Sequence, residues 1–139
     1  MIKLVRMFMC LASLTACTQT DLMPATDLAG NWRLLTYCKT NTQPGITGCT
    51  AVTVPADKSV IVSFANDSRF NETYQNTFPR DYAFLGCGGG NYEIRGKQVR
   101  IQAACMSSSN GQLFDLVSVD KTRLVINAGF LGDYVFERQ

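Results

Sequence analysis

Apolar and polar side chains alternate along most of this chain, with the period of two that is typical of strands buried on one face. The alternation is clearest within residues 90–105, where two alternating segments flank Gly96 and Lys97. A two-residue type II′ turn at this pair, with glycine at the position that needs a positive φ, aligns the apolar faces of the two segments. This register sets Ile94 opposite Val99. We therefore predict a β-hairpin at the centre of the stretch from residue 81 to residue 106.

The same period recurs in short segments that are separated by turn-forming residues. The predicted strands cover residues 32–38, 51–54, 59–65, 69–74, 81–85, 90–95, 98–105, 112–119, 123–128 and 133–138. No ten-residue stretch has the helical period, and an open sheet of this length leaves exposed edges. We predict an all-β fold, in which eight to ten short strands form a small antiparallel meander closed into a barrel.

A cysteine lies at the outer end of each arm of the predicted hairpin. In the register set by the turn, Gly88 lies opposite Cys105, and Cys87 is one residue out of step. One bulged residue among residues 88–90 brings the two cysteines opposite each other. Directly opposed residues have Cα atoms about 4.5–5.5 Å apart, which suits a disulfide. We predict a Cys87–Cys105 disulfide with such a bulge.

The first residues have the charged start and apolar centre of a secretory signal. The apolar run, residues 7–14, is too short for a transmembrane helix, which needs about 20 residues. It ends in the letters LTAC, which resemble the lipobox of bacterial lipoproteins. The resemblance implies cleavage after Ala16 and acylation of Cys17. The alternative is ordinary cleavage that leaves Cys17 as a free or paired thiol.

These features divide the chain into three parts: a signal peptide at 1–16, a lipidated cysteine with a flexible tether at 17–29, and a barrel domain at 30–139. The lipobox resemblance implies a membrane contact through the lipid, in the cell envelope. In bacteria that sort lipoproteins by the residue after the cysteine, Thr18 in place of an aspartate implies the outer membrane.

Of the six cysteines, two are lost to the signal and the lipid, which leaves Cys38, Cys49, Cys87 and Cys105. Four cysteines allow three pairings. Proximity in the sequence favours Cys38–Cys49 beside Cys87–Cys105, each stabilising the fold by about 3 kcal/mol. A zinc site is disfavoured, because the chain has no histidine and no CxxC spacing.

Charge narrows the range of partners. The chain has 13 basic and 11 acidic residues, and the excess lies in Lys3 and Arg6 of the predicted signal. The remaining 123 residues are formally neutral and carry no basic stripe, which disfavours nucleic-acid binding. That length suits one domain with a modest core, and we expect a monomer.

No catalytic constellation is visible. The absence of histidine removes the usual general base, and the serines at 107–109 have no base nearby. The carboxylates are scattered, and a GxSxG motif is absent. We expect that the protein is not an enzyme and needs no cofactor or metal.

Glu72 is the most informative carboxylate, because it shares a face of its predicted strand with Phe70 and Tyr74. If the strand is regular, Glu72 points into the barrel and is suited to a cationic or hydroxylated ligand. If the strand is irregular, Glu72 faces solvent, and this second interpretation is the one we favour. Glu72, Tyr74 and Tyr92 are the candidate ligand-binding residues.

Gly30-Asn31-Trp32 begins the first strand, and Arg138 ends the last. The pair resembles the lipocalins and their relatives, in which a G-x-W motif and an arginine meet at the closed end of the barrel. The resemblance implies that the guanidinium lies over the indole, a contact that contributes roughly 0.5–2 kcal/mol. It also implies that the barrel binds a small apolar or amphipathic ligand. Asp81-Tyr82 weakly resembles a second lipocalin motif.

A second resemblance is to the small β-domains of bacterial META-type envelope proteins, carried by Gly86-Cys87, Gly90-Asn91-Tyr92 and Cys105-Met106. It implies a filled core and a role in envelope maintenance without a ligand. The two interpretations differ in interior volume. Large aromatic side chains expected to point inward are Trp32, Phe64, Tyr74, Tyr82, Phe84, Tyr92, Phe114, Tyr134 and Phe136.

Overall fold

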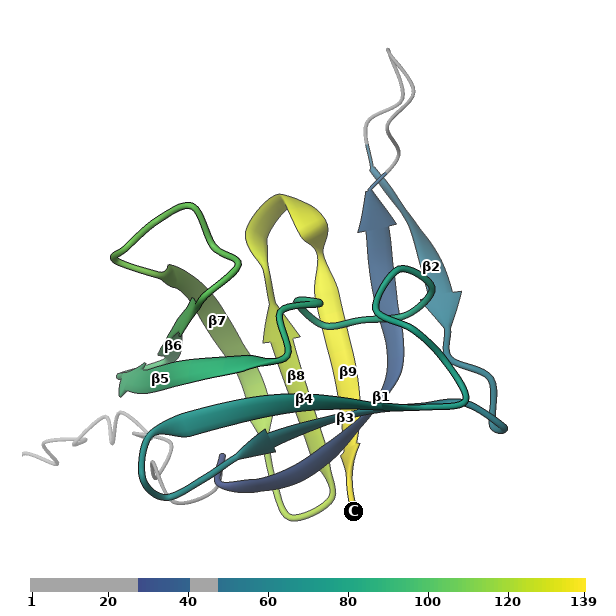
Figure 1. Cartoon of the computed structure of the whole chain (residues 1–139), viewed down its shortest axis with the longest axis horizontal. Coiled ribbons are helices and arrows are strands. Elements are labelled where there is room, and N and C mark those ends of the chain that lie inside the picture. The colour runs from purple at the N-terminus through teal and green to yellow at the C-terminus, as the bar shows by residue number, and fades with distance from the viewer. Residues whose placement is uncertain (1–27, 41–47) are drawn as a thin grey trace, which may run out of the picture.

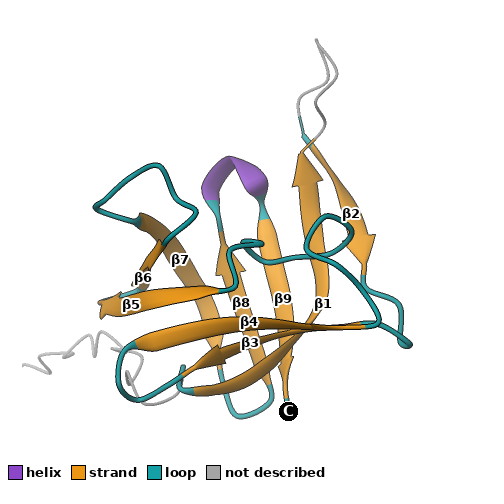
Figure 2. Ribbon diagram, viewed as in Figure 1, coloured by secondary structure: helices purple, strands orange, loops and turns teal. Residues whose placement is uncertain are grey.

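The computed structural model describes residues 28–40 and 48–139. In this part of the chain, nine strands and one short 3-10 turn are present (Figure 2). The strands are β1 (Gly30–Thr40), β2 (Cys49–Thr53), β3 (Ser59–Phe64), β4 (Arg69–Gln75), β5 (Gly89–Arg95), β6 (Gln98–Ala103), β7 (Gln112–Val119), β8 (Arg123–Asn127) and β9 (Asp133–Arg138). The predicted all-β fold is confirmed.

Eight strands form a closed antiparallel barrel, as predicted. Strands β3 to β9 pair in chain order, and β1 pairs with both β3 and β9, so that the sheet has no free edge at this seam. The ninth strand, β2, pairs with the outer half of β1, on the edge where β3 covers the inner half. The β1–β2 hairpin therefore extends beyond the rest of the barrel (Figure 1).

The segment between β4 and β5, residues 76–88, is a loop, so the strand predicted at 81–85 is wrong. We call this segment the plug loop. Its backbone cannot join a ladder at residues 84–86, because their N–H groups are hydrogen-bonded to the side chain of Glu72 instead.

The barrel interior is filled by the inward side chains that the alternation predicts. Among the described residues, nineteen hydrophobic ones are buried, and the largest of the fully buried side chains is Trp32. Of the nine aromatic residues expected to point inward, six are buried, and Tyr74, Tyr82 and Tyr92 are partly buried against the core. A bulge in β1 between Leu34 and Thr36 shifts the alternation by one residue. Tyr37 consequently stacks on Tyr134, with ring centroids 5.7 Å apart.

Both predicted disulfides are confirmed, each with a Cα–Cα distance of 5.4 Å. The predicted Ile94–Val99 register is also confirmed, and Gly96 has a φ of 62°. The predicted bulge among residues 88–90 is wrong, since the β5–β6 pairing runs unbroken to Gly90 and Ala103. The one-residue offset is taken up beyond the ladder, where a turn after Ala103 carries the chain to the second cysteine.

Candidate functional site

One end of the barrel, which holds both ends of the described chain, is closed around Trp32. The guanidinium carbon of Arg138 lies 4.1 Å from the centroid of this buried ring, and its Nη1 donates to the carbonyl of Ala29 at 2.9 Å. The indole Nε1 donates to the carbonyl of Leu28 at 2.8 Å. Gly30 has a φ of 140°, and a Cβ added to it would stand 2.5 Å from the Nη1 of Arg138. The structure thus brings together Gly30, Trp32 and Arg138.

The opposite end is filled by the plug loop. Its Phe84 is buried, and the ring lies 5.7 Å from Phe114, 5.1 Å from Tyr134 and 5.5 Å from Phe136, measured between centroids. Edge-on and tilted aromatic contacts of this kind add to the hydrophobic stabilisation of the core. The barrel interior at this end is therefore occupied by the protein's own side chain.

Glu72 holds this loop in place. Its carboxylate points into the barrel, is only 3% exposed, and accepts hydrogen bonds from the backbone N–H groups of Phe84 (2.6 Å), Leu85 (3.2 Å) and Gly86 (3.0 Å). The solvent-facing interpretation of Glu72 is wrong, because β4 keeps its regular alternation. The inward carboxylate is occupied by the chain itself.

Strand pairing explains why the loop is needed. β4 pairs with β5 only at Arg69, Phe70 and Asn71, although β4 continues to Gln75. The ladder between these two strands ends with the hydrogen bond from the Glu72 N–H to the Gly88 carbonyl, at 2.7 Å. Beyond this hydrogen bond the two strands separate, and the plug loop, residues 76–88, connects them.

The three candidate ligand residues separate into two places. Tyr74 lies beside Glu72, and burial together with that carboxylate raises the pKa of the Tyr74 hydroxyl well above its usual value. This hydroxyl is buried and makes no well-aligned hydrogen bond in the described part of the chain. Tyr92 points elsewhere, because its hydroxyl donates to the carbonyl of Ala65 at 2.8 Å, in the turn after β3.

A groove of about 450 Å³ lies beside the plug loop, and we call it the mouth groove. Its lining residues come from the β1–β2 hairpin, the turn before β3 and the plug loop: Tyr37, Lys39, Val52, Lys58, Arg80, Asp81 and Tyr82. Alternation within strands gave no indication of this groove, because two of its three walls are loops. Of its lining residues, the sequence motifs include only Asp81 and Tyr82.

Contacts within the mouth groove fix its two tyrosine rings. The Tyr37 hydroxyl donates to the backbone carbonyl of Asp81 at 3.3 Å, and the Nζ of Lys58 lies 5.5 Å from the Tyr82 ring centroid. Burial raises the pKa of the Tyr37 hydroxyl, with a further rise from Tyr82, so the phenol stays neutral at physiological pH. The Nε of Arg80 is 3.9 Å from the Asp81 carboxylate.

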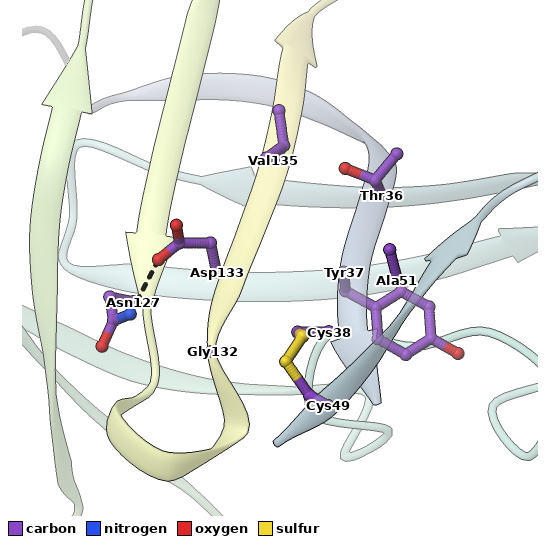
Figure 3. A pocket seen from close by; sticks show the side chains of 9 residues that line it. All are labelled: Thr36, Tyr37, Cys38, Cys49, Ala51, Asn127, Gly132, Asp133 and Val135. Carbon is purple, nitrogen blue, oxygen red and sulfur yellow. Dashed lines mark hydrogen bonds between the residues drawn. A yellow bond between two sulfur atoms is a disulfide. The ribbon is translucent and has the colours of Figure 1, made fainter. Parts of the chain in front are cut away.

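A second pocket, of about 350 Å³, lies outside the barrel over β1, β2 and β9 (Figure 3). The Cys38–Cys49 disulfide lies at one side, against Gly132, where a Cβ would stand 2.6 Å from the Cys38 Cβ. At another side the Asn127 side chain donates to Asp133 at 2.7 Å. These polar groups are already paired with each other, and the disulfide packs against the β8–β9 turn.

No family model and no curated protein matches the chain. Two solved structures resemble it. A lipocalin-like protein from Bacteroides uniformis has a TM-score of 0.46 and 14% identity, over 81% of this chain and 99% of that chain. An uncharacterized protein from Bacteroides eggerthii has a TM-score of 0.40 and 12% identity, with the same coverage. The barrel itself is established by the strand pairing.

Within residues 28–40 and 48–139, no helix is long and apolar enough to cross a membrane. The same residues contain no group of three or more side chains suited to holding a metal ion. The predicted lipidation site, Cys17, and the predicted signal and tether up to residue 27 lie outside the described residues.

Proposed function

We propose that the protein is a cell-envelope lipoprotein, anchored through Cys17, whose lipocalin-like barrel binds a small amphipathic molecule at its mouth. The observation that carries this proposal is the mouth groove, in which two partly buried tyrosine rings lie among charged side chains. Its volume of about 450 Å³ falls within the usual range for small-molecule sites.

The groove is a better site than the barrel interior because Phe84 and its neighbours already fill the interior. The apolar part of a ligand would lie against Tyr37, Val52 and Tyr82, and its polar part at the charged rim. Removal of such apolar surface from water contributes about 25 cal/mol per Å² to the free energy of binding. The proposal includes no catalytic step and no cofactor.

Binding is measured with the mature chain from Thr18 onward, made without lipid, since the described barrel closes on itself and contains its own core. The probe is N-phenyl-1-naphthylamine, a neutral aromatic molecule that fluoresces on leaving water. We expect saturable binding that weakens about tenfold in Tyr82→Ala. Leu113→Ala, which removes an exposed apolar side chain on β7, serves as the control and should bind as the unaltered chain does. Absent or equally affected binding would refute the site.

The anchor has its own test, labelling of growing cells with an alkyne-bearing fatty acid. The unaltered protein should take up label and Cys17→Ala should not. Cys10→Ala is the matched control, because it removes a cysteine from the apolar run just before the predicted lipobox. Equal labelling of the unaltered chain and Cys17→Ala would contradict the anchor, whatever the barrel binds.

A second function remains, that of a META-like envelope protein that acts through its surface without a ligand. The filled interior favours it. The two proposals separate in native mass spectrometry of protein purified from its own host. A bound small molecule supports the first proposal. Protein that carries no ligand and does not bind the naphthylamine probe supports the second.

A further inference from the structure

Three arginines on the barrel wall have close carboxylate partners. Arg33 contacts Glu137 at 3.0 Å, and Arg95 and Arg100 contact Glu93 at 3.0 Å and 2.8 Å. The cations of the mouth groove differ. Among the described residues, no carboxylate lies within salt-bridge distance of Lys39 or Lys58, and Arg80 has one long contact with Asp81.

Three cations therefore meet one carboxylate in the groove, although the chain beyond its predicted signal is formally neutral. They come from three segments: Lys39 from β1, Lys58 from the turn before β3, and Arg80 from the plug loop. Lys97 and Lys121 also lack carboxylate partners among the described residues, but each is exposed at the tip of a strand connection. Cations gathered in a partly enclosed groove attract anions more strongly than dispersed ones.

The aromatic side of the groove is preorganised. Tyr37 is held between its hydrogen bond to the Asp81 backbone and its stack on Tyr134, where the ring planes differ by 5°. Tyr82 lies under the Lys58 ammonium. A flat ring or a short chain placed on these tyrosines would have its polar end near the lysines.

We infer that the mouth groove binds a small amphipathic anion, with a carboxylate or sulfonate held by Lys39, Lys58 and Arg80 and an apolar part against Tyr37 and Tyr82. This inference rests on the proposed function and specifies the chemical class of its ligand. The three cationic side chains account for the preference for an anion over a neutral molecule. The two tyrosine rings account for the part of the affinity that anions and neutral molecules share.

Two matched probes test the class. 1-Anilinonaphthalene-8-sulfonate is the naphthylamine probe with one sulfonate added. We expect the sulfonate to bind at least tenfold tighter at low ionic strength, with the ratio approaching one at 0.5 M salt, because surface charges are then screened. The double variant Lys58→Gln/Arg80→Gln should lose this preference while keeping the affinity for the neutral probe within about twofold. Lys97→Gln/Lys121→Gln removes the same charge elsewhere and should change nothing.

Asp81→Asn gives a gain that is specific to the anion, whereas partial unfolding would expose apolar surface and raise the binding of both probes. Removal of the one carboxylate in the groove should tighten binding of the sulfonate several-fold and leave the neutral probe unchanged. Backbone amide shifts at Lys58 and Tyr82 should move during the titration, which locates the probe in the groove.

Each remaining outcome has a definite meaning. If both probes bind equally, the anion inference fails and the proposed function stands. If neither binds, both fail. Vesicles of phosphatidylglycerol form a further arm: if the unlipidated chain binds them through Lys58 and Arg80 and shows no preference for the soluble sulfonate, the groove is a membrane contact and the inference is overturned.

Discussion

The two ends of this barrel are closed by different means. At one end, Trp32 and Arg138 come from the first and last strands, which are hydrogen-bonded neighbours, so the closing contact is made inside the sheet. At the other end, a thirteen-residue loop without regular structure crosses the opening, and a buried carboxylate on β4 holds it. The first closure is a short local motif at each strand end. The second depends on the Glu72 carboxylate and three backbone N–H groups, which lie 12 to 14 residues further along the chain.

The two closures differ in the side chains that they bring to the ends of the barrel. At the first end, the closing side chains contact each other, with Trp32 fully buried beside the Arg138 guanidinium. A closure made by a loop brings along the loop's own polar and aromatic residues, and here these form a wall of the mouth groove. The variants below separate the two ends, and each should disturb one end while leaving the other as it is.

Phe84→Ala should have the largest effect. The ring fills the centre of an aromatic cluster, and its loss leaves a cavity that costs about 3–5 kcal/mol of unfolding free energy. The measurement is urea denaturation. Phe78→Ala in the same loop is the control, because Phe78 is 63% exposed, and it should stay within about ±0.5 kcal/mol. Similar values for both variants would show that the loop does not fill the barrel.

Glu72→Ala should destabilise the fold by about 3 kcal/mol, since it leaves three backbone N–H groups without their charged acceptor. Glu72→Gln keeps an acceptor oxygen and should cost about half as much. Hydrogen exchange locates the effect: the amides of Phe84, Leu85 and Gly86 should exchange faster, and the Trp32 indole N–H should not. Glu137→Gln, which breaks a partly exposed ion pair, should cost less than 1 kcal/mol. An equal loss in Glu137→Gln would argue against a special role for Glu72.

Much of the fold could be predicted because strand alternation and turn chemistry are local. The register around Gly96 and Lys97 follows from a glycine with positive φ in a two-residue turn. The pairing of the four cysteines follows from proximity in the sequence once the hairpin is recognised. Both features need only a few neighbouring residues to be specified.

The plug loop could not be predicted, because residues 81–85 have an alternation that suits a strand equally well. The outcome is decided by Glu72, nine residues earlier, whose carboxylate competes for the loop's N–H groups. The solvent-facing interpretation assumed an irregular strand, whereas the regular alternation on β4 places the carboxylate inside, where an unpaired charge would be costly. Here the backbone N–H groups of Phe84, Leu85 and Gly86 offset that cost in place of a cationic side chain. Backbone donors of this kind cannot be predicted from a sequence pattern.

Gly30→Ala tests the fit at the closed end, with an expected loss of about 2 kcal/mol. The new Cβ would meet the guanidinium of Arg138, and the residue would keep a φ of 140°, which a side chain rarely adopts. Gly48→Ala is the matched control, since Gly48 has a φ of 122° and no described residue places an atom within 4 Å of the added Cβ. The difference between the two thermal stabilities measures the clash alone. Equal losses would mean that backbone strain, and not the guanidinium, requires the glycine.

Arg138→Ala should have the smallest effect and is the most specific for this end. If Trp32 owes its burial to the strands alone, the substitution behaves as a surface change, within about ±0.5 kcal/mol. If the guanidinium closes the barrel over the indole, from which it is 4.1 Å away, its loss should cost about 1–2 kcal/mol.

Fluorescence gives the second readout for this variant, because Trp32 is the one tryptophan of the chain and its emission is unambiguous. Water that reaches the uncovered ring should shift the emission to the red, while the plug-loop amides should keep their exchange rates. Arg138→Lys should recover only part of the stability, since an ammonium cannot lie flat on the ring as a guanidinium does. An Arg138→Ala protein with unchanged melting temperature and unchanged emission would leave the closed end to the strands alone, and the lipocalin-like interpretation of this end would fail with it.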